Sequence, residues 1–204
     1  MKRKGALFVV CGPSGVGKGT VCKELLKVKP EIGLSISATT RERRKGETEG
    51  VSYYFIDRDE FENMIESDEL LEYAEVYNNL YGTPKKYVLE QLDRGYDIIL
   101  EIDPQGAMQV KEKYPEGVFV FLLPPSMKEL RNRIVTRGRD SEDNIEKRLK
   151  CANEEIDFIS EYDYYIINDD LTKAVNSLVS IIEAERCKVK ENICELIKVY
   201  KEEI

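Results

Sequence analysis

The stretch Gly12-Pro-Ser-Gly-Val-Gly-Lys-Gly-Thr20 decides the fold of this chain. An apolar run, residues 6–11, precedes it, and residues 21–26 follow it with helical spacing. A strand, a glycine-rich turn and a helix start in this order gather backbone N–H groups around one point, and Lys18 adds a mobile positive charge. An ordinary tight turn that caps a helix is the alternative. Three glycines and a lysine at these offsets favour a loop that binds the β- and γ-phosphates of a nucleotide instead.

Position 19 departs from the standard form of such a loop. Gly19 follows the lysine where the usual pattern has Ser or Thr, whose hydroxyl binds Mg²⁺. A hydroxyl ligand at this position is therefore excluded, and Thr20 lies one place further along the expected helix.

Composition narrows the classes of partner. The chain has 204 residues, of which 42% are hydrophobic, so it can bury one core with small insertions. A net charge of −8 argues against non-specific binding of nucleic acid or membranes. Residues 128–150 nevertheless hold eight Lys/Arg against five Asp/Glu, which fits a small anionic ligand. The five scattered cysteines fit unpaired thiols in a reducing cytoplasm, and we expect no targeting segment or membrane span. The oligomeric state stays open.

The chain contains no histidine, which removes the commonest general base and every Ser-His or Cys-His nucleophile. The chemistry must then use an acceptor that is already ionised, or a carboxylate base. A nucleoside monophosphate qualifies, because its second phosphate pKa is about 6. Phosphoryl transfer to such an acceptor needs positioning and charge neutralisation more than proton removal.

Apolar runs alternate with helical patterns along the chain, which predicts an α/β fold with a parallel sheet covered on both faces. Ligands bind beyond the carboxyl ends of the strands in such sheets. A helix is expected over Asp59–Ser67, and residues 176–204 are expected to pack as a helical tail on the core. The expected strands are Ala6–Cys11, Asp97–Ile102, Val118–Leu123 and Tyr164–Ile167, with a weaker one over Leu34–Ala38.

Two stretches do not fit this alternation and are interpreted as insertions over the open end of the sheet. Residues 39–83 are polar and rich in Tyr, Arg and Gly. Residues 125–148 comprise an arginine-rich helix, a break at 136–139 and a second helix. The hypothesis is a single domain with a core of residues 1–34, 84–124 and 149–204, an acceptor-binding insertion of residues 35–83 and a lid of residues 125–148.

Beyond the first loop the chain closely resembles guanylate kinases, over roughly residues 4–185. The motifs that carry the resemblance are the glycine-lysine loop, Thr39-Thr-Arg-x-x-Arg-x-Gly-Glu47, Tyr81-Gly-Thr83, Ile102-Asp-x-Gln-Gly106, the arginine-rich lid and Ile167-Asn-Asp169. The resemblance implies the fold of P-loop nucleoside monophosphate kinases, with ATP as phosphoryl donor, GMP as acceptor and Mg²⁺ held mainly through phosphates and water. It also implies that dGMP is accepted.

The resemblance assigns residues to each part of the reaction. It implies ATP binding by Gly12, Pro13, Ser14, Gly15, Val16, Gly17, Lys18, Gly19, Thr20, Asn168 and Asp169. It implies GMP binding by Ser37, Arg41, Arg44, Tyr53, Glu72, Tyr81, Thr83 and Asp103. Catalysis is assigned to Lys18, Arg44, Arg137 and Arg148, with Arg133 and Arg139 left open.

Several residues at or near the expected site have a second interpretation. Glu72 could be a surface carboxylate on a helix, but one carboxylate can accept from both N1–H and N2–H₂ of guanine, whereas adenine has a lone pair at N1. Asn168 and Asp169 could cap a helix as well as lie near adenine. Glu101 and Asp103 both end an apolar strand, and the sequence does not separate a role near the metal from one near the acceptor.

The best interpretation is a cytoplasmic guanylate kinase. A non-catalytic guanylate-kinase-like binding domain is the first alternative, although the intact P-loop argues against it. A P-loop kinase for another phosphate acceptor is the second, and Glu72 with Ser37 and Thr83 argues against that.

Overall fold

The computed structural model describes residues 4–76, 78–136, 142–189 and 193–202. Within this part of the chain, one sheet has five strands in the order β2-β7-β1-β8-β9, and every pair is parallel. Four predicted strands are confirmed to within two residues, and the fold class is the expected α/β type. The strands are β1 Leu7–Cys11, β2 Gly33–Leu34, β7 Ile98–Glu101, β8 Val118–Leu123 and β9 Tyr164–Ile167.

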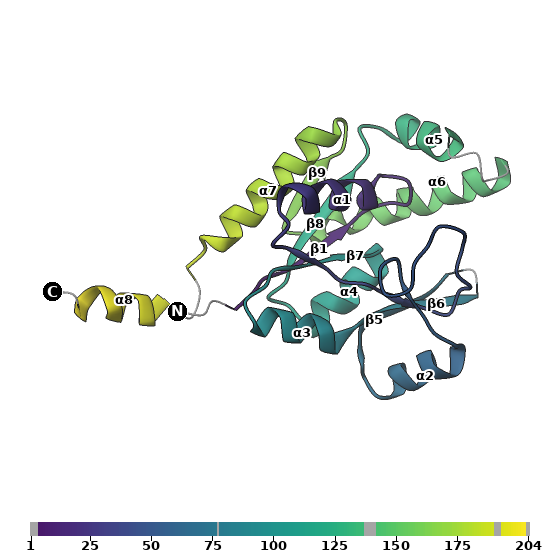
Figure 1. Cartoon of the computed structure of the whole chain (residues 1–204). Coiled ribbons are helices and arrows are strands. Elements are labelled where there is room, and N and C mark those ends of the chain that lie inside the picture. The colour runs from purple at the N-terminus through teal and green to yellow at the C-terminus, as the bar shows by residue number, and fades with distance from the viewer. Residues whose placement is uncertain (1–3, 77, 137–141, 190–192, 203–204) are drawn as a thin grey trace.

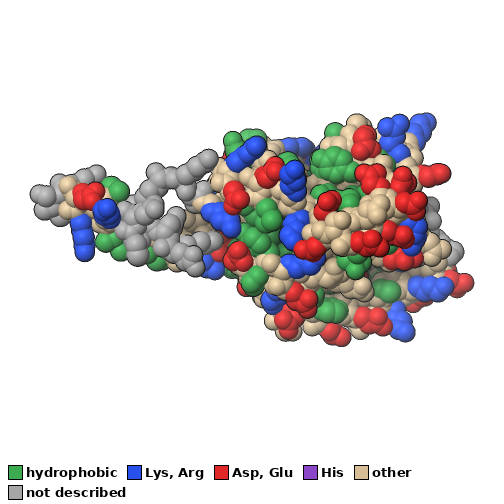
Figure 2. Space-filling view, turned by 90° about the horizontal axis from the view of Figure 1, so that it is seen from below, with side chains coloured by type: hydrophobic (Ala, Val, Ile, Leu, Met, Phe, Trp, Pro, Cys, Tyr) green, Lys and Arg blue, Asp and Glu red, His purple; other side chains and the backbone are tan. Residues whose placement is uncertain are grey.

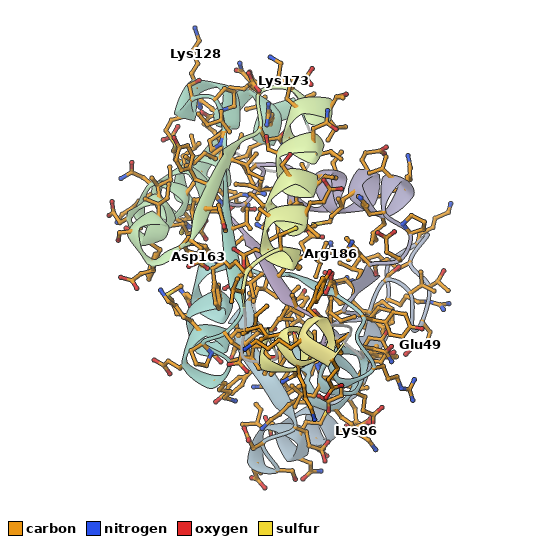
Figure 3. All side chains as sticks on the ribbon, turned by 90° about the vertical axis from the view of Figure 1, so that its left-hand side faces the viewer. Glu49, Lys86, Lys128, Asp163, Lys173 and Arg186 are labelled. Atoms are coloured by element: carbon orange, nitrogen blue, oxygen red, sulfur yellow. The ribbon has the colours of Figure 1, made fainter. Side chains whose placement is uncertain are left out.

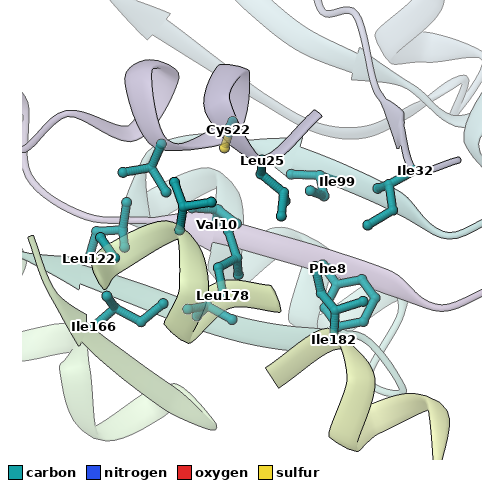
Figure 4. Close-up of a cluster of buried hydrophobic side chains, with 14 of the residues drawn as sticks. Phe8, Val10, Cys22, Leu25, Ile32, Ile99, Leu122, Ile166, Leu178 and Ile182 are labelled. Carbon is teal, nitrogen blue, oxygen red and sulfur yellow. The ribbon is translucent and has the colours of Figure 1, made fainter. Parts of the chain in front are cut away.

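Helices cover both faces of this sheet (Figure 1). Alternate side chains of β1 divide between two cores, because successive residues of a strand point to opposite faces. Phe8 and Val10 join the core under α1 (Lys18–Val28) and α7 (Leu171–Arg186), which Figure 4 shows. Leu7, Val9 and Cys11 join the core under α3 (Lys85–Asp93) and α4 (Pro104–Lys113). The sheet is therefore buried on both sides, and its C-terminal edge remains for a ligand.

A second sheet was not foreseen. The described strands between residues 38 and 84 form a four-stranded sheet in the order β4-β3-β6-β5. The predicted single strand over Leu34–Ala38 is wrong, because Leu34 is the last residue of β2 in the first sheet and Ala38 is the first residue of β3 in the second sheet. The strands of the second sheet are β3 Ala38–Thr39, β4 Tyr54–Phe55, β5 Leu70–Val76 and β6 Asn79–Pro84.

One helix packs on the second sheet. The predicted helix over Asp59–Ser67 is confirmed as α2 (Arg58–Glu66), where Asp57 caps the N-terminus by accepting from Glu60 N at 2.7 Å. Phe61 of this helix is fully buried against Ala38, Leu70 and Leu80 of the sheet. The inserted segment therefore has a small hydrophobic core of its own.

Two helices stand over the P-loop at the other side of the sheet's open end. They are α5 (Met127–Thr136) and α6 (Glu142–Ile156), which pack through Leu130, Ile134 and Ile145. The second helix runs past residue 148, where the expected lid ended, and a 3₁₀ turn, η1 (Asp157–Glu161), follows it. The predicted break at 136–139 lies largely outside the described residues.

The expected packing of the whole C-terminal tail is wrong. Leu178 and Ile182 of α7 are fully buried in the core, as expected. The last described helix, α8 (Ile193–Glu202), instead lies apart from the body of the molecule (Figure 1). Its Ile197 and Tyr200 are 46% and 66% exposed. Helical spacing alone does not say which surface an apolar stripe will cover.

The surface agrees with the mixed charge of the sequence. Acidic and basic side chains intermingle over the face shown in Figure 2. Among the helices described here, none combines the length and the apolar run needed to cross a lipid bilayer.

A buried carboxylate joins three elements at the edge of the sheet away from the P-loop. Asp97 is 3% exposed, and it accepts from Ala6 N at 2.8 Å and from Arg186 Nε at 2.7 Å. Arg186 lies at the end of α7 (Figure 3) and also reaches Glu31 at 3.5 Å. The end of α7 is thereby fixed to the residues that directly precede β1 and β7.

We predict that Asp97→Ala lowers the free energy of unfolding by about 2–4 kcal/mol, because it leaves a buried N–H and a guanidinium without their acceptor. Glu31→Gln is the matched control, since it removes only the exposed partner of the same arginine and should cost less than about 0.5 kcal/mol. Urea unfolding of both variants tests this. Equal losses in the two variants would contradict it.

Candidate functional site

The P-loop lies between β1 and α1, at the carboxyl ends of the core strands. Gly12, Gly15 and Gly17 have φ of 140°, 95° and 102°, a range that residues with a Cβ rarely adopt. Helix α1 begins at Lys18, and its N-cap Gly17 offers no side-chain hydrogen bond. The first N–H groups of the helix are therefore directed at the loop, where they can bind an anion.

Lys18 and Glu101 place opposite charges at the mouth of this loop. The Lys18 ammonium donates to Gly12 O at 2.5 Å. Burial raises the pKa of Glu101, although the positive charge of Lys18 lowers it. A Cβ at position 19 would lie 3.1 Å from Glu101 Oε1, so Gly19 leaves the space that this carboxylate fills.

The oxygen ligands at the mouth of the P-loop fit a magnesium ion. The missing hydroxyl at Gly19 is replaced in space by the carboxylate of Glu101. Thr20 and Glu101 both line a hollow of about 590 Å³ over the loop. Mg²⁺ is usually held by one or two carboxylates together with phosphates and water, which this arrangement can supply.

Asp103 lies elsewhere, so the structure separates the two carboxylates that the sequence could not. It caps α4 by accepting from Gly106 N at 2.8 Å. Gly106, which donates to it, adjoins Glu72, and the charge of Asp103 contributes to the raised pKa of Glu72 and also to those of Cys11 and Glu155. Glu101 therefore lies beside Lys18 and Gly19, whereas Asp103 lies near both Glu72 and the end of β1.

Glu72 is buried on strand β5, so the alternative of an exposed helical carboxylate is wrong. It is 4% exposed and accepts from Thr83 Oγ1 at 2.6 Å. Burial raises its pKa to about 7, the bond from Thr83 lowers it, and the charge of Asp103 raises it. A Cβ on Gly106 would lie 2.7 Å from Glu72 Oε2, so the glycine makes room for the carboxylate.

Arg41 is held in a cage of carboxylate and aromatic groups. Its two terminal nitrogens donate to both oxygens of Glu47, at 3.1 and 2.8 Å, and its Nε donates to Tyr81 Oη at 3.2 Å. The guanidinium lies 5.6 Å from the centre of the Tyr53 ring. Glu47 also accepts from Arg44 N at 2.7 Å, while the Arg44 side chain is exposed.

Glu47 is a site residue that the sequence analysis did not single out. Its pKa is lowered mainly by the hydrogen bonds from Arg41, then by the backbone N–H of Arg44. The available signal was its place at the end of the Thr39–Glu47 motif, where only the arginines were considered as ligands.

Helix α6 contacts the P-loop at Ser14. Arg148 Nη2 donates to Ser14 Oγ at 2.7 Å. Two turns later, Glu155 receives a hydrogen bond from the backbone N–H of Ser14, and burial is the main cause of its raised pKa. Its Oε2 is buried without a hydrogen-bond partner in the part of the chain described. Glu155 was missed because a glutamate in a charged helix usually indicates a solvated face.

A second hollow, of about 570 Å³, lies beside the loop between α5 and the end of β9. Asn168 and Asp169 line it, and Asn168 is buried and donates to Val16 O at 2.8 Å. Arg133 donates to the backbone oxygens of Val16 and Asn168, at 3.3 and 3.0 Å. The helix cap that this sequence also allowed is provided by Asp170, which accepts from Lys173 N.

The remaining expected site residues have mixed outcomes. Ser37 is partly buried at the start of the second sheet, where its carbonyl oxygen accepts from Tyr54 N. Arg137 and Arg139 lie outside the described residues, so their predicted roles remain predictions. The structure thus brings together two hollows at the P-loop, a buried carboxylate and an arginine cage.

The fold and these sites define a class of protein. A P-loop at the carboxyl end of a parallel sheet, flanked by a helical pair and a second, small sheet, is the architecture of a P-loop nucleoside monophosphate kinase. The family model described as guanylate kinase matches residues 4–185. The chain therefore belongs to the guanylate kinase family.

Known guanylate kinases are similar to this chain over all or nearly all of its length. The chain is 52% identical to the guanylate kinase of Caldanaerobacter subterraneus, covering 100% of this chain and 99% of the relative. It is 59% identical to the guanylate kinase of Carboxydothermus hydrogenoformans, covering 92% of each. The crystal structure of guanylate kinase from Anaplasma phagocytophilum matches with a TM-score of 0.80 and 37% identity, covering 98% of this chain and 96% of that one. These findings support guanylate kinase function. They support neither a non-catalytic binding domain nor a P-loop kinase for another phosphate acceptor.

The buried carboxylate of Glu72 makes stability depend on pH. Its pKa of about 7 exceeds its ordinary value of 4.5, so the folded state keeps a proton that the unfolded state loses. Protonated Glu72 therefore contributes to the free energy of unfolding below pH 4.5. This contribution, on the order of 3 kcal/mol, is lost as the pH rises through 7. Glu72→Gln does not titrate. We predict that the variant loses less unfolding free energy than the wild type between about pH 5 and pH 8.

Urea unfolding of both proteins at the two pH values measures this difference. Thr83→Val is a useful companion, because it removes the bond that lowers the pKa and should steepen the pH dependence. Parallel curves for wild type and Glu72→Gln would show that Glu72 is ionised in the free protein at all these pH values.

Proposed function

We propose that this chain transfers the γ-phosphoryl group of ATP to GMP, and also to dGMP, to give ADP and the nucleoside diphosphate. The observation that carries the choice of acceptor is the buried Glu72, which lies with Thr83 on the second sheet. Guanine presents N1–H and N2–H₂ side by side, and one carboxylate accepts from both. Adenine would set a lone pair at N1 against the carboxylate, which is repulsive in a desolvated pocket.

The P-loop is the proposed site for the phosphates of ATP. The N–H groups at the start of α1 and the ammonium of Lys18 supply positive potential at one point. Asn168 and Asp169 line the adjoining hollow, which is the proposed place for adenine. Bound Mg²⁺ would neutralise phosphate charge, held through the phosphates, through water and by Glu101.

The acceptor phosphate is proposed to bind at the arginine cage. The planar fork of Arg41 suits a phosphate as well as the carboxylate of Glu47, and Tyr53 and Tyr81 supply hydroxyl groups beside it. Arg44, held at its backbone by Glu47, adds a second guanidinium, which is exposed. Ser37, Thr83 and Asp103 complete the proposed GMP site.

The transfer itself needs no general base, which fits a chain without histidine. The GMP phosphate is largely a dianion at pH 7 and can attack directly. The proposed catalytic groups therefore hold and neutralise charge: Lys18, Arg44, Arg137 and Arg148. Arg148 already contacts Ser14 in the P-loop, so α6 can bring its charge to the transferring group while excluding water.

ADP release measured with GMP, dGMP, AMP, CMP and UMP tests the proposed reaction. We expect GMP and dGMP to be phosphorylated and the other three to be used at least about a hundredfold less efficiently, because only guanine pairs with Glu72. Lys18→Ala should lower kcat by more than about tenfold with the fold intact. Equal use of AMP and GMP, or a variant with wild-type kcat, would refute the respective assignment.

The two arginine sites should differ in kinetics. Arg148→Ala removes charge near the transferring group, so we predict a large fall in kcat with little change in the KM for GMP. Arg41→Ala removes a ground-state contact of the acceptor phosphate and should mainly raise that KM. Ser14→Ala is a companion variant, because it removes the hydroxyl that Arg148 contacts and leaves the guanidinium of Arg148 in place. If Arg148→Ala kept the wild-type kcat but bound GMP more weakly, Arg148 would be a ground-state contact and the proposed difference between the two arginines would be wrong.

A further inference from the structure

The strand that carries Glu72 is irregular at that residue. In the β5–β6 pair, Leu70 lies opposite Pro84 and Tyr73 lies opposite Gly82. Leu71 and Glu72 therefore face the single residue between them, which is a β-bulge. Bulges redirect side chains, and a register slip of one residue would turn Glu72 to the other face of the sheet. The direction of Glu72 thus depends on whatever fixes this bulge.

The outer edge of β5 is not paired with another strand among those described, because β5 ends the sheet order. The side-chain amide of Gln109 fills that role for Tyr73, the residue after Glu72. Tyr73 N donates to Gln109 Oε1 at 3.1 Å, and Gln109 Nε2 donates to Tyr73 O at 2.8 Å. One side chain therefore makes both hydrogen bonds that a neighbouring strand would make.

Gln109 acts together with two other residues on one face of α4. Gly106, Gln109 and Lys113 are three and four residues apart, which aligns them along the helix. Gly106 leaves the space for Glu72 Oε2, and Lys113 donates to Leu70 O at 2.9 Å, on the other side of the bulge. Helix α4 also packs on β1 of the core and lies beside β5 (Figure 1).

We infer that Gln109 is a positioning residue for base selection: its amide fixes the bulged edge of β5, and this directs Glu72 at the guanine. The inference rests on the proposed function, because it concerns the acceptor of that reaction. Gln109 does not touch the base. It acts through the backbone of Tyr73, so its loss should affect how well the carboxylate meets both N–H groups of guanine, and the ATP site should be unaffected.

The test compares GMP with IMP, whose base keeps N1–H but lacks the N2 amino group. The ratio of the two kcat/KM values does not depend on the concentration of folded enzyme, so a loss of stability alone leaves it unchanged. Gln109→Met keeps the side-chain length and removes the amide. We expect the GMP/IMP ratio to fall about tenfold, the size of one or two lost hydrogen bonds, with the KM for ATP unchanged.

Lys111→Met is the matched control on the same helix. Lys111 donates to Glu161, on η1, so its loss removes a contact of α4 that does not reach β5. It should leave the ratio at the wild-type value. Gly106→Ala is the second variant, because a methyl group there would displace Glu72 directly while favouring the helix. It should lower the ratio like Gln109→Met.

The outcomes separate the inference from the proposed function. If the wild type released no ADP with GMP, the proposed function itself would fail. If it used GMP normally but Gln109→Met kept the wild-type GMP/IMP ratio, only the role of Gln109 would be overturned. A fall of equal size in Lys111→Met would also overturn it, because any disturbance of α4 would then suffice. An unchanged ratio in Gly106→Ala would show that the position of Glu72 does not set the preference.

Discussion

The turn between β1 and α1 must leave its backbone N–H groups free to face an anion, and the other parts of the site depend on that requirement. Positive φ values at Gly12, Gly15 and Gly17 keep the N–H groups converging. The loop is held partly from within, because Lys18 donates to Gly12 O and Val16 is fully buried. Neighbouring elements also hold it: Asn168 and Arg133 donate to Val16 O, and Arg148 donates to Ser14. The same contacts bring the hollow proposed for adenine and the arginine of α6 to the proposed phosphate site.

The acceptor side is built on a different principle, a carboxylate kept in a pocket that disfavours its charge. Burial and the negative charge of Asp103 raise the pKa of Glu72 to about 7, although the hydroxyl and the backbone N–H of Thr83 both donate to it. This costs stability in the free protein and leaves the carboxylate without enough donors. We expect a base with two adjacent N–H groups to offset that deficit, and one without them not to. The proposed selectivity for guanine and the instability of the empty pocket then have the same physical cause.

Helix α4 connects the two sides. Asp103 caps its start, Gly106 and Gln109 face β5, and Val110 is buried in the core beneath the sheet. Helix α4, which packs on β1, therefore also sets the position of the second sheet. The P-loop begins at the end of β1. A single framework thus sets the places of donor and acceptor, which transfer between two bound nucleotides requires.

The sequence by itself determined the parallel sheet, the P-loop and the family, because apolar strand runs, glycine spacing and fixed motifs are local patterns. It also predicts that Glu72 and the arginines form a GMP site. Only the tertiary structure decided that Glu101 lies at Gly19 and that Asp103 caps α4, whose Gly106 adjoins Glu72, since the two residues are only two apart in the chain. It alone revealed the bulge at Glu72, the amide of Gln109 on its edge, the carboxylates Glu47 and Glu155, and the separate course of α8. These features depend on contacts between residues distant in the chain, and a polar side chain on a helix or loop gives no local sign of which backbone it will meet.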